Sequence, residues 1–118
     1  MNTKKIREII AYRAKVEEVS QGENYNEIEK CWERLANTLC EDINASIRFL
    51  QEDCTGDEYS WISEVLDDVA EREGGHEFVE CFKSLVPKFS EECKKYNIIS
   101  AIEIAEAILE EKEKQDEN

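Results

Sequence analysis

Apolar residues recur every three or four positions along most of the chain, which is the period of an amphipathic α-helix. The pattern predicts helices over residues 3–19, 26–53, 57–73 and 76–85, then a short helix after Pro87 and a last one that starts at Ser100. No segment alternates apolar and polar residues as a half-buried strand would. The sequence therefore predicts an all-α, single-domain bundle of five or six helices.

The start of the last helix carries a recognisable signal. Ser100 and Glu103 have the spacing of a capping box, and Ile99 and Ile104 have that of a hydrophobic staple, so we expect these isoleucines to touch. The residues after Leu109 include no apolar side chain. We therefore assign residues 1–109 to one helical domain and expect residues 110–118 to form an acidic tail that frays.

The stretch from Asp57 to Gly75 combines an apolar skeleton with a dense set of carboxylates. Read as one helix, it places on the core side Trp61, Ile62, Val65, Leu66, Val69 and Ala70. About half a turn away, a second stripe faces solvent and consists of Glu64, Asp67, Asp68 and Glu71. Like charges at this spacing repel one another, so stability alone does not favour the stripe.

The charge of the whole chain narrows the classes of partner. The 118 residues include 29 Asp and Glu against 15 Lys and Arg, a net charge of −14. Such a surface repels phosphate backbones and anionic membranes, so we expect neither nucleic acid nor a membrane as a partner. Charged residues interrupt the apolar positions near the N-terminus, which argues against a signal peptide and predicts a cytoplasmic protein.

The first helix has the opposite charge to the rest of the chain. Between Thr3 and Lys15 it has one acidic residue, Glu8, against five basic residues, Lys4, Lys5, Arg7, Arg13 and Lys15. We expect this basic face to lie beside one of the protein's own acidic faces or in solvent.

Residues typical of catalysis or metal binding are missing from the sequence. Five cysteines are widely spaced with no CxxC pair, and His76 is the only histidine. We interpret the cysteines as reduced and mostly structural. The chain also has no phosphate-binding glycine loop, HExxH or GxSxG motif. We therefore expect no enzymatic activity, metal or cofactor.

These exclusions leave the acidic stripe as the candidate functional surface. Carboxylates steer a basic partner and an aromatic residue anchors it, so the predicted contact set is Asp57, Glu58, Tyr59, Glu64, Asp67, Asp68 and Glu71. Here Tyr59 is assigned to the surface and Trp61 to the core. A solvated face with no partner remains an alternative, and a competing acidic site combines Glu41, Asp42, Glu52 and Asp53.

The second half of the chain also resembles a known group of proteins. Tyr59, the run Trp61-Ile62-Ser63-Glu64-Val65, the pair Asp67-Asp68 and the segment EFVECFKSLVPKFSEECKKYNI are similar to small helical immunity proteins of bacterial contact-dependent growth inhibition and related polymorphic toxin systems. The resemblance extends to about Leu109. It implies a cytoplasmic antitoxin that binds the toxin domain of a cognate effector and blocks its active site.

That group implies a nuclease as the target, with an EndoU-class ribonuclease as one candidate, in a 1:1 complex. A nuclease needs a basic cleft to attract phosphate, and an acidic helix face competes for the same charges. The alternative is an acidic helical adaptor or regulatory module that binds another basic protein.

Overall fold

A computed structural model describes residues 3–20 and 23–116. Within these ranges the chain forms eight helices and no strand, so the all-α prediction is confirmed and the predicted count of five or six is too low. The helices are α1 (Thr3–Ser20), α2 (Tyr25–Glu41), α3 (Ile43–Glu52), α4 (Gly56–Ser63), α5 (Leu66–Ala70), α6 (Gly75–Ser84), α7 (Ser90–Lys95) and α8 (Ile98–Asp116).

The count is higher because two predicted helices each contain a break. The first break lies at Asp42, whose backbone is extended (φ −149°, ψ 90°). Its carboxylate accepts a hydrogen bond from the Ala45 amide at 3.1 Å and so caps the start of α3. The Ser46 hydroxyl donates to the Leu39 carbonyl at 2.7 Å across the same corner. The chain therefore turns after α2, and α3 packs on α6.

The second break falls inside the acidic stretch, at Glu64 and Val65, and separates α4 from α5. Ile62, Val65 and Leu66 are each 0% exposed on the two sides of this turn. A straight helix would direct a narrower stripe of residues inward, whereas the turn buries side chains on both short helices. The acidic residues 57–71 therefore do not form one continuous stripe.

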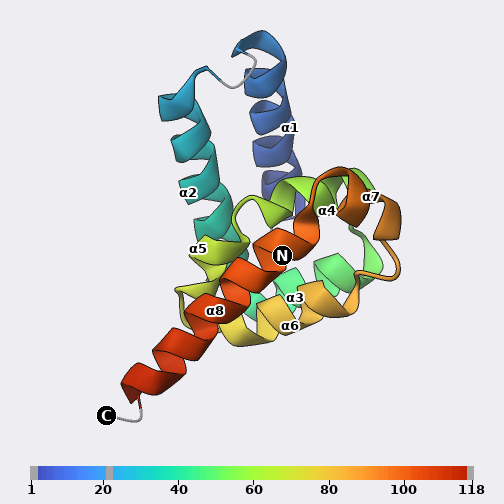
Figure 1. Cartoon of the computed structure of the whole chain (residues 1–118). Helices are drawn as coiled ribbons and strands as arrows, with labels where there is room; N and C mark the ends of the chain where they lie inside the picture. Colours follow the sequence, from blue (N-terminus) through green and yellow to red (C-terminus); the bar gives the residue numbers. More distant parts are fainter. Residues whose placement is uncertain (1–2, 21–22, 117–118) are drawn as a thin grey trace.

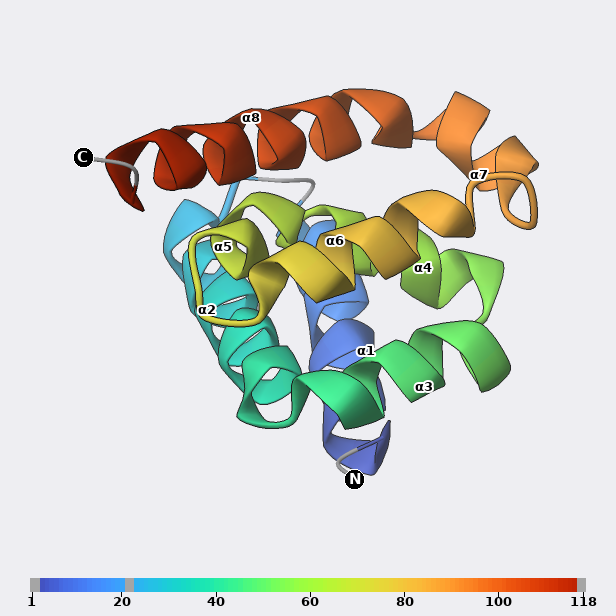
Figure 2. The same ribbon diagram turned by 90° about the horizontal axis from the view of Figure 1, so that it is seen from below.

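Figures 1 and 2 show how the helices are arranged around the core. α1 and α2 lie side by side, and their upper ends in Figure 1 extend beyond the other helices. α8 crosses the molecule over α5 and α6, and Figure 2 shows α8, α6 and α3 in successive tiers. α4 and α7 close one end of this layered part.

Aromatic side chains fill the centre, and Tyr59 is one of them. Tyr59 is 0% exposed, and its ring stacks on Phe82 at 3.9 Å and on Phe89 at 4.5 Å between ring centroids. Its hydroxyl donates to the Phe82 carbonyl at 2.7 Å. The predicted surface position of Tyr59 is wrong, because Tyr59 precedes Ile62 by three residues and shares its buried side of α4. Trp61 is only partly buried.

The start of α8 also differs from the prediction. The helix begins at Ile98, after Asn97 takes the left-handed conformation (φ 53°), which asparagine adopts more readily than most residues. Ser100 therefore lies inside the first turn instead of capping it. Ile99 and Ile104 are 43% and 54% exposed, so the predicted staple does not enclose them.

The C-terminal end of α8 extends into the predicted tail. The helix continues to Asp116, and the Lys112 ammonium donates to the carbonyls of Ala70 at 3.1 Å and Arg72 at 3.3 Å. These carbonyls close the turn after α5, so the lysine ties the end of α8 to α5. The helix therefore includes residues 110–116 of the predicted tail, and residues 117–118 lie outside the described residues. No helix in the described ranges has the length and apolar character that crossing a membrane requires.

Candidate protein-binding surface

The basic face of α1 lies against the protein's own acidic residues. The Arg7 guanidinium donates to Glu58 at 2.8 Å, and Arg13 donates through two nitrogens to the two carboxylate oxygens of Glu64, at 2.9 and 3.0 Å. One of the two expectations for this helix is thus confirmed for Arg7 and Arg13. The contact between α1 and α4 neutralises part of the charge that the sequence assigned to the functional surface.

Glu64 is the centre of a partly buried network that joins three helices. The Trp32 indole nitrogen on α2 donates to the same carboxylate at 3.0 Å, and the Arg13 guanidinium lies 5.0 Å from the centre of the Trp61 ring. Arg13 is only 6% exposed. Burial opposes its charge, but hydrogen bonds to Glu64 and Glu17 raise the pKa of Arg13 above its ordinary value. Glu64 therefore holds the fold together and is not a free surface charge.

Glu58 is also occupied within the fold, at the start of α4. Its carboxylate accepts the Thr55 amide at 3.0 Å while the Thr55 hydroxyl accepts the Glu58 amide at 3.1 Å, which completes a capping box. Partial burial opposes ionisation, yet the hydrogen bonds from Arg7 and Thr55 lower the pKa of Glu58. Asp57 is exposed at this same end of α4, at the opposite end of the helix from Glu64.

A groove between α2 and α5, which we call the acidic groove, contains the predicted contact residues Asp67 and Asp68 but not Glu71, which is exposed at the end of α5. It has a volume of about 660 Å³ and is lined by Tyr25, Glu29, Trp32, Glu33, Glu64, Asp67, Asp68 and Arg72. Asp67 and Asp68 are exposed and form no salt bridge or side-chain hydrogen bond within the described part of the chain. Five carboxylates and one guanidinium thus share one concave surface.

The negative charges in the groove act on one another. Partial burial and the Asp67 carboxylate raise the pKa of Asp68 above its ordinary value of 3.8. Arg72 opposes this rise, while Glu71 and Glu33 add to it. Glu33 lies on α2, so the two walls of the groove repel each other through their carboxylates. A cation placed between them would relieve that repulsion.

Sequence reasoning missed the contribution of α2 to this site. Glu29 and Glu33 are four residues apart and flank Trp32, a spacing that places both on one side of α2. This four-residue spacing identifies Glu29 and Glu33 as neighbours on α2, but only the fold shows that they line the same groove as Asp68. Tyr25 supplies the exposed aromatic residue that Tyr59 does not, because it is 57% exposed and meets the Trp32 ring edge to face at 6.0 Å.

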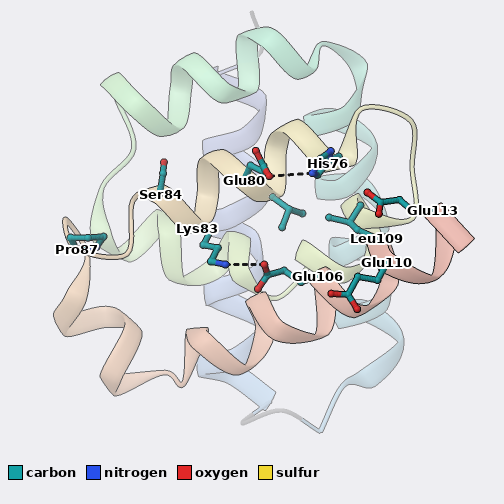
Figure 3. A pocket seen from close by; sticks show the side chains of 10 residues that line it. His76, Glu80, Lys83, Ser84, Pro87, Glu106, Leu109, Glu110 and Glu113 are labelled. Carbon is teal, nitrogen blue, oxygen red and sulfur yellow. Dashed lines mark hydrogen bonds and ion pairs between the residues drawn. The ribbon is translucent and has the colours of Figure 1, made fainter.

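A second hollow lies between α6 and α8 and has a different character (Figure 3). Its volume is about 510 Å³, and Val79 and Leu109 provide apolar lining. Lys83 on α6 forms an ion pair with Glu106 on α8 at 2.9 Å, which spans the hollow. The Nε2 atom of His76 lies 3.2 Å from the Oε1 atom of Glu80 on the same helix. Lys83 and His76 thus contact two of the four carboxylates that line this hollow, and the other two are Glu110 and Glu113.

The thiols are placed as packing groups. Cys31, Cys54 and Cys93 are buried, whereas Cys40 and Cys81 are partly buried, and none of the five forms a disulfide. Burial raises the pKa of every one of these thiols, that of Cys54 to about 12. The thiols are therefore protonated at neutral pH. The described residues contain no group of three or more His, Cys, Asp or Glu arranged to hold a metal ion.

Comparisons of the chain with models of protein families, with curated proteins and with solved structures find no match.

Proposed function

We propose that the protein is an immunity protein that binds a cognate bacterial toxin domain in the cytoplasm and neutralises it in a 1:1 complex. The observation that supports this most strongly is the acidic groove, in which Asp67 and Asp68 lie near the exposed ring of Tyr25 and have no ion-pair partner among the residues that the structure describes. Partial burial and neighbouring carboxylates raise the pKa of Asp68, so its ionised form is unfavourable in the isolated protein. A basic partner turns the same charge into binding free energy.

A nuclease is the toxin class whose chemistry fits this groove best. Its active site concentrates positive charge to bind phosphate, and the carboxylates on α2 and α5 present negative charge of comparable density. An EndoU-class ribonuclease is one such target. Occupation of the basic cleft by the acidic groove excludes the substrate without any catalytic group on this chain, which agrees with the expectation that the protein is not an enzyme.

Electrostatic attraction also matches the kinetic demand on an immunity protein. Complementary fields raise association rate constants towards about 10⁸–10⁹ M⁻¹s⁻¹ at low salt, compared with about 10⁵–10⁶ M⁻¹s⁻¹ without steering. A toxin must be captured before it cleaves its substrate. The proposed role therefore favours exposed, unpaired carboxylates over carboxylates already engaged in the fold.

Co-expression tests the proposal. The reading frame adjacent to the gene of this protein, which the proposal predicts to encode the toxin domain, is induced in bacteria with and without the protein, beside a toxin of another type as the specificity control. We expect growth to be rescued from the adjacent toxin only. Equal killing with and without the protein would reject the immunity function. An acidic adaptor that binds another basic protein would then be the better proposal.

A further inference from the structure

We propose that Tyr96 and Ile104 form an apolar docking site next to the acidic groove and receive an apolar side chain of the same basic partner. The inference rests on the proposed function and extends it. Tyr96 is 51% exposed at the end of α7, and Ile104 is 54% exposed on α8. Single exposed apolar residues are common on protein surfaces, but these two line one hollow and so form a joint apolar contact point.

The two side chains line one hollow, which we call the α7–α8 hollow. It has a volume of about 280 Å³, and its walls are Ser63, Glu64, Asp67, Tyr96, Ala101 and Ile104. A smaller hollow of about 180 Å³ adjoins it and shares Ser63, Glu64 and Tyr96 while adding Ser60 and Trp61. Apolar side chains and carboxylates thus line the same concave surface.

This surface is continuous with the acidic groove. Glu64 and Asp67 line both the α7–α8 hollow and the acidic groove, so they form the border between the two. The hydrogen bonds of Glu64 to Arg13 and Trp32 fix that border in place. A partner that seats a basic group on Asp67 and Asp68 therefore brings its neighbouring residues over Tyr96 and Ile104.

The turn between α7 and α8 sets the position of Tyr96. The Tyr96 amide donates to the Glu92 carbonyl at 3.0 Å, and the left-handed Asn97 follows directly. Ile98 then enters the core with 0% exposure. The backbone on both sides therefore sets the position of Tyr96, and the Lys95 ammonium lies 5.2 Å from the centre of its ring.

The charge around the hollow selects the kind of occupant. A second copy of this chain would bring another net charge of −14 against Glu64 and Asp67, and an anionic membrane would be repelled in the same way. A basic protein domain with an apolar side chain beside its cationic surface satisfies both parts of the site. Such an arrangement, with an apolar centre next to steering charges, is common in tight interfaces.

The two parts of the surface are expected to affect different rate constants. Carboxylates act at long range and govern association, whereas close apolar packing governs dissociation. We expect Ile104→Ser to raise the dissociation rate constant at least about tenfold, as for an interface anchor, and to leave the association rate constant nearly unchanged. Tyr96→Ser should act in the same direction. Neither effect should depend strongly on salt.

The matched control is Ile99→Ser. Ile99 lies on the same helix and is 43% exposed, but it does not line the α7–α8 hollow, and its separation from Ile104 turns it to another side of α8. We expect it to bind like the unmodified protein. Circular dichroism and thermal melting check that all three variants fold.

Rates are measured with the adjacent toxin domain, made catalytically inactive, immobilised on a sensor surface. If the unmodified protein binds and Ile104→Ser dissociates at the same rate, the docking site is refuted while the proposed function stands. Equal losses from Ile104→Ser and Ile99→Ser would refute it as well, because the effect would not be local. If the unmodified protein does not bind, both proposals fail. A dimer in sedimentation that Ile104→Ser dissociates would assign the hollow to self-association and also overturn the inference.

Discussion

Two pairs of carboxylates from one short acidic stretch differ completely in their surroundings. Glu58 and Glu64 on and after α4 face the basic side of α1, where Arg7 and Arg13 hold them by hydrogen bonds of 2.8–3.0 Å. Asp67 and Asp68 on α5 face α2, which presents Glu33 instead of a cation. The break between α4 and α5 separates the two environments.

This difference separates charge used for folding from charge available for binding. Protonation equilibria reflect it, because the pKa of Glu58 is lowered while that of Asp68 is raised. Where an ionised carboxylate is stabilised by its surroundings, a partner can gain little from it. Where it is destabilised, a basic partner gains the most, so the comparison directs the proposed interface towards α5 and α2 and away from α4.

The largest expected effect is the loss of the network around Arg13. We expect Arg13→Met to lower the free energy of unfolding by about 3 kcal/mol, the low end of the range for breaking a buried ion pair, because Glu64 keeps some access to water. Urea denaturation followed by circular dichroism measures it. Arg7→Met is the control, and it should cost clearly less because the Arg7 side chain is 47% exposed. Equal losses would contradict the greater burial of the ion pair between Arg13 and Glu64 relative to that between Arg7 and Glu58.

A smaller effect is expected at Tyr59. Tyr59→Phe removes the hydroxyl that donates to the Phe82 carbonyl and should destabilise the fold by about 1 kcal/mol. Toxin affinity should stay unchanged, since the ring is fully buried. Binding titration of the folded variant measures this. A loss of affinity without a loss of stability would restore Tyr59 to the interface and argue against the structure.

The smallest expected changes in the free energy of unfolding have opposite signs at Asp68 and Glu58. Because the folded pKa of Asp68 is raised, ionisation of Asp68 destabilises the fold as the pH rises above the ordinary pKa of 3.8. Asp68→Asn should therefore raise the free energy of unfolding at pH 7 by about 0.3 kcal/mol, which is the scale of like-charge repulsion on a helix. The gain should vanish below the ordinary pKa of 3.8.

Glu58 contributes in the other direction, because its folded pKa is lowered. Its stabilisation is present above its ordinary value of 4.5 and is lost as pH falls through the folded pKa, so Glu58→Gln should destabilise the protein at pH 7 and much less in acid. Unfolding curves recorded across this pH range compare both variants. Shifts of the same sign would show that α4 and α5 do not differ as described.

The sequence was sufficient for the all-α class because the apolar period of a helix is a local signal. It was not sufficient for the breaks at Asp42 and Glu64. A periodic pattern continues across a turn when both sides remain buried, as Ile62, Val65 and Leu66 do. The Asp42 cap was visible in principle, since aspartate favours such a position, but the apolar period outweighed it in the prediction.

The candidate site was predicted only in part, for a related reason. Asp67 and Asp68 were named from their local density of charge, and the structure places both in the acidic groove. The cations that neutralise Glu58 and Glu64 come from α1, and the groove's second wall comes from α2, so both depend on contacts between distant segments. The predicted capping box at Ser100 was wrong because α8 already begins at Ile98, directly after the left-handed Asn97.

The affinity of a double charge reversal on α5 tests the central claim most directly. Asp67→Lys with Asp68→Lys is compared with Glu52→Lys and Asp53→Lys, which make the same charge change in the competing acidic site. This control spares Glu41, which pairs with Lys5, and Asp42, which caps α3. Dissociation constants for the inactive toxin domain are measured at low and at high salt.

We expect the α5 double variant to raise the dissociation constant at least about tenfold, mainly through slower association and more strongly at low salt, because close charge pairs at tight interfaces couple by about 1.5–7 kcal/mol. The Glu52→Lys, Asp53→Lys variant should stay close to the unmodified protein. Unchanged affinity in the α5 variant with a loss in the control would place the interface on the competing acidic site and contradict the account.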